Sequence, residues 1–293
     1  MISISIVNFS GATGTLKWFL NFFNTIDTIK LVKNNENPDI LFCSLFGDIN
    51  IIKNISAKCK IFFTGENLIL RPPYNNEQLL LETFDLLLGF KYTNLSKKTL
   101  RFPLWLAYYP FYCTKTDNNI IDYIEKQHLL NKNHTTQNSA VIIARHDMGG
   151  QRIQIIKEIE KYISVLAPGR FYNNTKLIGS TTIDKINYLK QYNYNICPEN
   201  SEGEGYCTEK IFQALESGTI PIYWGSSYPE VDIINENKYC FCDIKNPEKM
   251  SKSIKDAIEN PDKYLEGNIF KENSKEIIQQ YYDDLIKYIK DNV

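Results

Sequence analysis

The stretch NICPENSEGEGYCTEKIFQALESGTIPIYWGS, residues 195–226, joins a strand, a glycine-bearing loop, a helix and a second strand. The apolar run that ends near Glu199 predicts the first strand, and TIPIYWG at 219–225 predicts the second. Between them the apolar spacing predicts a helix over 208–217, with Thr208 as its N-terminal cap. A strand, a helix and a strand in succession are typical of an α/β layer with a parallel sheet.

The same alternation extends through both halves of the chain. In the first half we expect strands at 2–9, 40–46, 60–66 and 85–90 and a helix over 18–32. In the second half we expect strands at 140–146, 163–169, 192–200, 219–225 and 238–244 and helices over 151–162, 182–191 and 208–217. The pattern therefore predicts an α/β protein of two Rossmann-like domains that face each other across a cleft.

A polar stretch over 112–139 is the best candidate for a linker. It divides the chain into a first domain at 1–135 and a second at 136–293, in keeping with roughly 100–200 residues per domain. A predicted helix at 276–290 could pack back on the first domain.

Charge and hydropathy exclude two classes of function. The chain carries 33 Lys and Arg against 34 Asp and Glu, a net charge of -1, which argues against nonspecific nucleic-acid binding. No apolar run approaches about 18 residues, so no membrane span is expected. The start MISISIVNFS resembles a first strand rather than a signal peptide, and the odd count of seven cysteines favours reduced thiols. We expect a cytoplasmic protein, with peripheral contact to a membrane left open.

The loop and helix at the centre of residues 195–226 have the chemistry of a phosphate site. Gly203 and Gly205 allow close backbone approach, a helix N-terminus favours an anion, and Lys210 adds a cation there. Neither GxGxxG nor GxxxxGK[ST] is present. Ordinary strand-loop-helix architecture therefore remains the alternative interpretation.

These residues resemble the motif of the α1,3/4-fucosyltransferases, family 10 of the glycosyltransferases, and most closely that of its bacterial members. The shared features are Glu-Asn-Ser, a loop with Tyr, Thr-Glu-Lys and an Ile-Pro-Ile strand that ends in glycine. Three further blocks are similar to family segments: IFFTGENL at 61–68, FDLLLGF with RFPLW at 84–105, and HDMGGQRIQIIKEIEKY at 146–162.

The resemblance implies a GT-B fold, GDP-fucose as the donor and inversion at the anomeric carbon. It makes Glu66 the catalytic base, Arg152 and Lys210 the partners of the diphosphate, and Glu209 the partner of the ribose hydroxyls. Each residue also has a plain interpretation, since Glu66 suits a turn, Arg152 and Lys210 suit a solvated helix face, and Glu209 suits a first helical turn.

Four more residues are implied in the donor site. Glu199, Asn200 and Tyr206 are expected to line the donor pocket, and Arg170 to contact phosphate or guanine. Asn200 could instead fix the geometry of the loop.

The expected reaction moves L-fucose to a hydroxyl, with O3 favoured, of GlcNAc or Glc in an oligosaccharide or glycolipid. No metal or other cofactor is required, although a divalent cation could stimulate transfer. Two alternatives stay open: the same scaffold with another nucleotide sugar or acceptor, and a GDP-sugar-binding protein that has lost catalysis.

Overall fold

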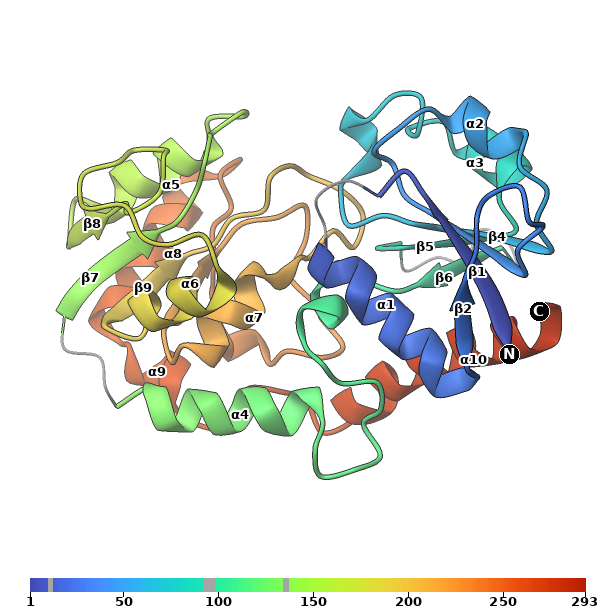
Figure 1. The fold of residues 1–293 in the computed structure, drawn as a ribbon. Coiled ribbons are helices and arrows are strands. Elements are labelled where there is room, and N and C mark those ends of the chain that lie inside the picture. The colour runs from blue at the N-terminus through green and yellow to red at the C-terminus, as the bar shows by residue number, and fades with distance from the viewer. Residues whose placement is uncertain (10–12, 92–97, 134–136) are drawn as a thin grey trace. The chain divides into compact units, whose positions relative to one another are not determined.

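The computed structural model describes residues 1–9, 13–91, 98–133 and 137–293, and they form two compact units. Unit 1 comprises residues 1–116, 203–206 and 276–293, and unit 2 comprises residues 117–202 and 207–275. Each unit has one sheet with helices on its faces (Figure 1). The predicted boundary between 135 and 136 lies outside the described residues. The units divide at 116 and 117, because helix α4 (Ile120–Asn131) packs against α7 (Glu209–Glu216) of unit 2.

The sheet of unit 1 is wholly parallel, with strand order β2-β1-β3-β4-β5-β6. Its strands are β1 (Ile2–Val7), β2 (Ile29–Leu31), β3 (Ile40–Cys43), β4 (Cys59–Phe63), β5 (Leu86–Gly89) and β6 (Thr99–Arg101). Its helices are α1 (Thr13–Ile26), α2 (Ile49–Lys53), α3 (Glu77–Thr83) and most of α10 (Ser274–Asn292), with 3-10 turns η1 (Leu68–Leu70) and η2 (Leu104–Tyr108).

Four strands of unit 1 were predicted, and two parts of the prediction were incomplete or wrong. The strands β1, β3 and β5 fall inside their expected ranges, and β4 begins one residue before its expected start at 60. The helix expected over 18–32 begins earlier and ends at Ile26, after which the chain forms the edge strand β2. The strand β6, at the other edge, was not predicted.

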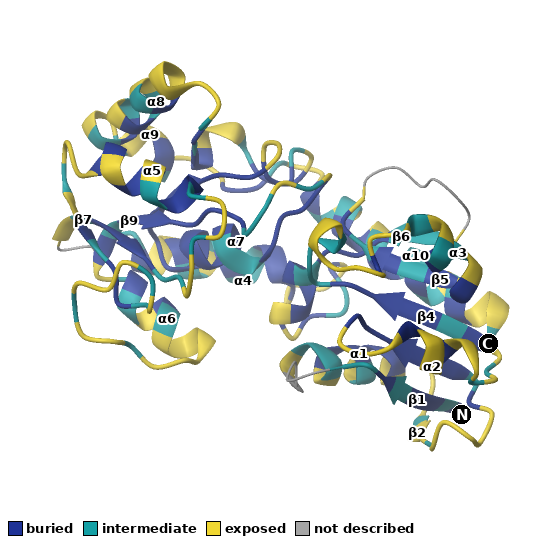
Figure 2. Cartoon of the chain, turned by 90° about the horizontal axis from the view of Figure 1, so that it is seen from above, coloured by how far each residue is buried: buried dark blue, intermediate teal, exposed yellow. Residues whose placement is uncertain are grey.

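Alternating residues of β3 direct the helices of unit 1 to opposite faces. Leu41 and Cys43 belong to the apolar cluster with α2 and α3. Phe42, between them, contacts Phe19 and Phe23 of α1, with ring centroids 4.8 and 5.2 Å apart. Figure 2 shows that the strands are largely buried and that the exposed residues lie on the outer helix faces and loops.

An aromatic cluster around Trp18 joins the two ends of unit 1. The Trp18 ring lies 5.3 Å from Phe22, 5.7 Å from Phe102 and 6.2 Å from Tyr282 of α10. Its indole N–H donates to the Tyr109 carbonyl at 2.6 Å. The C-terminal helix is therefore part of the core of unit 1.

The sheet of unit 2 is also parallel, with strand order β11-β10-β9-β7-β8. Its strands are β7 (Gln137–Ile142), β8 (Ser164–Leu166), β9 (Tyr192–Ile196), β10 (Ile220–Tyr223) and β11 (Cys240–Phe241). Besides α4 and α7, its helices are α5 (Gln151–Ile159), α6 (Thr182–Leu189), α8 (Pro247–Glu259) and α9 (Asp262–Leu265), with the 3-10 turn η3 (Glu236–Lys238).

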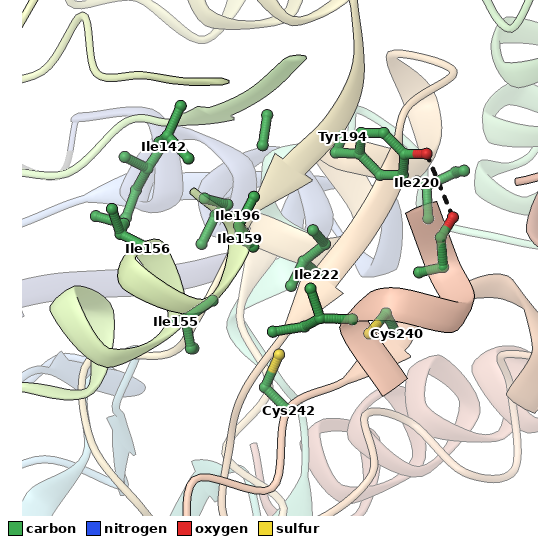
Figure 3. Close-up of a cluster of buried hydrophobic side chains, with 14 of the residues drawn as sticks. Ile142, Ile155, Ile156, Ile159, Tyr194, Ile196, Ile220, Ile222, Cys240 and Cys242 are labelled. Atoms are coloured by element: carbon green, nitrogen blue, oxygen red, sulfur yellow. Dashed lines mark hydrogen bonds between the residues drawn. The ribbon is translucent and has the colours of Figure 1, made fainter. Parts of the chain in front are cut away.

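The predicted strands and helices of unit 2 are present, with ends that shift by a few residues. Figure 3 shows the main core, where isoleucines of the sheet meet Ile155, Ile156 and Ile159 of α5. The Tyr194 hydroxyl crosses this core and donates to the Ala257 carbonyl of α8 at 3.3 Å. Helices α5 and α8 thus cover one face of the sheet, and α6 and α7 lie on the other face.

Helix α7 ends at a glycine that no other residue can easily replace. Gly218 has φ of 79°, in the left-handed region, and its N–H donates to the Leu215 carbonyl at 3.0 Å. A Cβ atom there would lie 2.4 Å from the Lys132 nitrogen. The glycine therefore lets α7 end against the last turn of α4.

Within the described ranges, no helix has both the length and the apolarity that a membrane crossing demands. The same part of the chain holds no cluster of three or more His, Cys, Asp or Glu side chains placed to bind a metal ion.

Candidate active site

Glu199, just beyond β9, is a fully buried carboxylate at the start of α7. Its N–H donates to the Trp224 carbonyl at 2.8 Å, so backbone pairing continues past the strand and fixes its position. One carboxylate oxygen accepts the Thr208 N–H at 2.7 Å. The other accepts the Thr208 hydroxyl and the Lys210 ammonium, each at 2.8 Å. All three donors belong to the first turn of α7 or to its cap.

The start of α7 therefore differs from the sequence expectation in one respect. Thr208 occupies the cap position, but its side chain makes no cap hydrogen bond to the helix, because Glu199 holds its hydroxyl. The positive end of the helix already has a carboxylate beside it. Lys210, with a side chain 20% exposed, is fixed by that carboxylate rather than free to move.

Arg152 is a buried cation of unit 2, and it is 4% exposed. It lies in the first turn of α5, where the Asp147 carboxylate accepts its N–H at 3.2 Å. Its guanidinium donates to the Asn200 side-chain oxygen at 2.8 Å and to the His146 carbonyl. The expected donor residues Arg152 and Asn200 are thus in direct contact.

Glu209 and Lys185 complete the charged group. Burial of Glu209 opposes its ionisation, but the positive charges of Lys210 and Lys185 together hold its pKa below the ordinary 4.5. For Lys185, burial is the main cause of a pKa below the ordinary 10.5, and the charge of Glu209 works against it. A cavity of about 20 Å³ lies among these groups and is lined by Arg152, Lys185 and Lys210. We call it the basic cavity.

Arg170 lies apart from this group. It is exposed in the turn after β8, and no hydrogen bond or ion pair of its side chain was found among the described residues. It does not line the basic cavity.

Glu66 lies in unit 1, in the tight turn that follows β4. The Thr64 hydroxyl donates to the Glu66 carbonyl at 2.7 Å and accepts the Glu66 N–H at 3.1 Å. Asn67 then caps the 3-10 turn η1. After this turn the Arg71 guanidinium lies 3.2 Å from the Glu66 carboxylate. The Glu66 side chain is 33% exposed, so its carboxylate is fixed but accessible.

Glu66 lines a cavity of about 330 Å³ in unit 1. We call it the unit 1 cavity. Its wall is mainly apolar, with a polar minority that includes Thr64, Glu66 and Asn67. This size and composition are typical of small-molecule sites.

The segment 203–206 brings part of the glycine-bearing loop into unit 1. Tyr206 lines the unit 1 cavity together with Glu66, and its ring meets Phe90 edge-on with centroids 4.8 Å apart. The buried Arg101 guanidinium donates to the Gly205 carbonyl at 3.5 Å and to the Phe90 carbonyl. Arg101 therefore holds residues 203–206 against the rest of unit 1.

Apart from Arg170, the structure distributes the predicted site residues between two places. It brings Arg152, Glu199, Asn200, Glu209 and Lys210 together in unit 2, and it puts Glu66 and Tyr206 in the wall of one cavity in unit 1. Sequence reasoning missed Lys185, which looks like an ordinary surface lysine of a predicted helix. It also gave no role to Arg101, although the RFPLW block was noted.

The chain has the glycosyltransferase fold of the GT-B type, with two α/β units whose sheets are wholly parallel. One unit has an accessible carboxylate in a cavity, and the other has the basic cavity. The chain belongs to glycosyltransferase family 10, the fucosyltransferases. The family's C-terminal sequence model matches residues 131–287, and the model of the alpha-(1,3)-fucosyltransferase FucT N-terminal domain matches residues 4–108.

Individual relatives agree with this assignment. The chain is 27% identical over 266 residues to the alpha-(1,3)-fucosyltransferase FucT of Helicobacter pylori, over 82% of this chain and 52% of that protein. It thus spans about half the length of that relative. A putative fucosyltransferase-like protein of Arabidopsis thaliana is 33% identical over 85 residues, 28% of this chain and 16% of that one.

Solved structures support the fold. A crystal structure of an alpha1,3-fucosyltransferase with GDP-fucose superposes with a TM-score of 0.70 at 23% identity, over 98% of this chain and 90% of that chain. The sucrose-phosphate synthase of Thermosynechococcus elongatus reaches 0.56 at 8% identity, over 100% of this chain and 95% of that one.

Proposed function

We propose that the protein transfers L-fucose from GDP-fucose, with inversion, to O3 of GlcNAc or Glc in a glycan acceptor. The observation that carries the donor half of this proposal is the basic cavity, where Arg152 and Lys210 are held in place next to Glu209. A nucleoside diphosphate is the natural guest of such a group, since guanidinium and ammonium groups bind phosphate oxygens strongly. The identity of the sugar rests on family membership.

Each donor residue has a part in the proposed reaction. Arg152 and Lys210 stabilise the negative charge that grows on GDP as the bond from fucose C1 to the phosphate oxygen breaks. Glu209, whose pKa is held below the ordinary 4.5 by Lys210 and Lys185 against the effect of burial, stays ionised and accepts hydrogen bonds from the ribose hydroxyls. Glu199 acts through its neighbours, by holding Lys210 and the start of α7.

Glu66 is the proposed base. The acceptor hydroxyl attacks C1 from the side opposite the diphosphate, the new glycosidic bond forms, and the hydroxyl proton passes to the Glu66 carboxylate. The leaving GDP needs no proton. Arg71 keeps the carboxylate in place through one ion pair at 3.2 Å, while a third of the Glu66 side chain stays open to a substrate.

The unit 1 cavity is the proposed acceptor site. Its volume of about 330 Å³ is enough for part of an oligosaccharide or glycolipid. Its aromatic wall residues, among them Phe90 and Tyr206, suit the apolar faces of sugar rings.

The proposed reaction uses protein cations for the charge on the diphosphate. We therefore expect transfer to persist in excess EDTA, although added divalent ions could raise the rate. Loss of all transfer in EDTA, restored by one specific ion, would contradict this part of the proposal.

The deciding experiment compares Glu66→Gln with Glu82→Gln, an exposed glutamate of α3 that serves as the matched control. We expect Glu66→Gln to bind GDP as the parent does but to transfer fucose at least about 100-fold more slowly, and Glu82→Gln to behave as the parent. A thermal-shift panel identifies the donor, because a ligand at about 100 times its Kd adds about 2.7 kcal/mol of stability. Stabilisation by UDP-sugars and not by GDP or GDP-fucose would overturn the donor.

A further inference from the structure

Lys185 is a cation without a bonding partner in the described structure. It lies on α6, whose first turn is fixed by a reciprocal Thr181 and Asp184 capping box. Among residues 1–9, 13–91, 98–133 and 137–293, no hydrogen bond and no carboxylate oxygen within 4.0 Å was found for its ammonium. This contrasts with Lys161, two residues beyond α5, which lies 2.6 Å from a Glu158 carboxylate oxygen.

The surroundings of Lys185 make the absence of a bonded anion energetically unfavourable. The side chain is only partly exposed and lines the basic cavity with Arg152 and Lys210. Burial lowers its pKa, the charge of Glu209 acts against this shift, and the charge of Lys210 adds to it. A charge taken out of water is unfavourable unless it is bonded to an opposite charge.

The other two cations of the cavity are already bonded within the protein. Lys210 lies 2.8 Å from the Glu199 carboxylate, and Arg152 donates to the Asn200 side chain and the His146 carbonyl. Lys185 is therefore the cation of this cavity that still needs an anion. The cavity itself, at about 20 Å³, has room for no more than a water molecule or a phosphate oxygen.

We propose that Lys185 is a third cationic contact of the donor, and that its ammonium binds an oxygen of the diphosphate at the basic cavity. This inference rests on the proposed function, since it requires a nucleoside diphosphate as the ligand. Lys185 is thus a binding residue that gains a bonded anion when the donor arrives, in addition to the nearby charge of Glu209.

The alternative is a structural role, in which Lys185 serves only to orient Glu209. Burial raises the pKa of Glu209, and the charge of Lys185 is the second cause, after Lys210, that lowers it. The two roles predict opposite effects on the ligand-free protein. Removal of a partly buried charge that has no bonded anion should leave stability unchanged or raise it, whereas removal of a support for Glu209 should lower it.

The test is Lys185→Met, with Lys190→Met as the control at the other end of the same helix and outside the cavity. GDP affinity is measured by calorimetry and ligand-free thermal midpoints by scanning. We expect Lys185→Met to weaken GDP binding about 10- to 100-fold, the range for a hydrogen bond to a charged group, with a thermal midpoint at or above that of the parent. Lys190→Met should match the parent in both.

A double-mutant cycle with Glu209→Gln completes the test. If Lys185 binds phosphate, the loss of GDP affinity caused by Lys185→Met persists in the Glu209→Gln background. If Lys185 acts through Glu209, that loss vanishes there, and the inference is overturned. Unchanged GDP affinity in Lys185→Met also overturns it. Failure of the parent to bind GDP is a different result, because it removes the proposed function itself.

Discussion

Replacement of Glu199 by glutamine should destabilise unit 2 far more than its single atom of difference suggests. The carboxylate is fully buried and accepts three hydrogen bonds at 2.7–2.8 Å, one of them from the Lys210 ammonium. Glutamine keeps one acceptor oxygen but presents an NH₂ group to donors that have no acceptor left. Lys210 then loses its counter-charge, and breaking a buried ion pair in this way costs about 3–5 kcal/mol.

Glu202→Gln is the matched control for this experiment. Glu202 lies in the same unit and pairs with Lys245 at 2.8 Å, but the two side chains are 42% and 75% exposed. Such a surface pair contributes about 0–1 kcal/mol. Urea unfolding should therefore separate the variants by about 2–5 kcal/mol, and hydrogen exchange should show faster opening of α7 in Glu199→Gln alone. Equal losses in the two variants would refute the assignment of Glu199 as the buried anchor of α7.

Three further results are expected. Arg152→Lys should weaken GDP binding about 10-fold in calorimetry, because an ammonium cannot reproduce the guanidinium fork; unchanged affinity would count against the diphosphate role. Gly218→Ala should lower the stability in urea by more than 1 kcal/mol, since φ is 79° and the new Cβ meets backbone, whereas Gly14→Ala, in open helix, should not. The Ser3 hydroxyl and N–H hold the pKa of Asp39 below 3.8, so this stabilisation is present above that value and is lost as pH falls through the lowered pKa. Unfolding at acid and neutral pH should show a smaller acid loss in Ser3→Ala, and an equal loss would contradict this reasoning.

The fold was predictable where buried strands carry uninterrupted apolar runs. Strand β3 is such a run and β4 is interrupted only by Lys60, and the two lie at the centre of their sheet. The edge strand β2 has only three residues, two of them exposed, so its pattern continues that of the preceding helix. Strand β6 was not predicted for the same reason. It is an edge strand of three residues, and such a strand needs neither length nor burial on both faces.

The motif named candidate site residues, but it did not indicate the contacts between them. The motif placed Glu199 and Lys210 in the donor half, yet no local pattern shows that a buried carboxylate holds both Lys210 and the Thr208 hydroxyl. Tyr206 was expected among the donor residues, and it contacts Phe90 within unit 1 because the loop 203–206 folds onto that unit.

Because unit 1 includes residues 276–293, it is completed late during synthesis. After residue 116 leaves the ribosome, 159 further residues must follow before 276 appears, which takes roughly 8–30 s at about 5–20 residues per second. During that time the Trp18 and Phe102 rings lack Tyr282. Unit 2 is continuous except for four residues, so the half that is translated second can finish folding first, while the first half waits with an aromatic surface that chaperones would recognise.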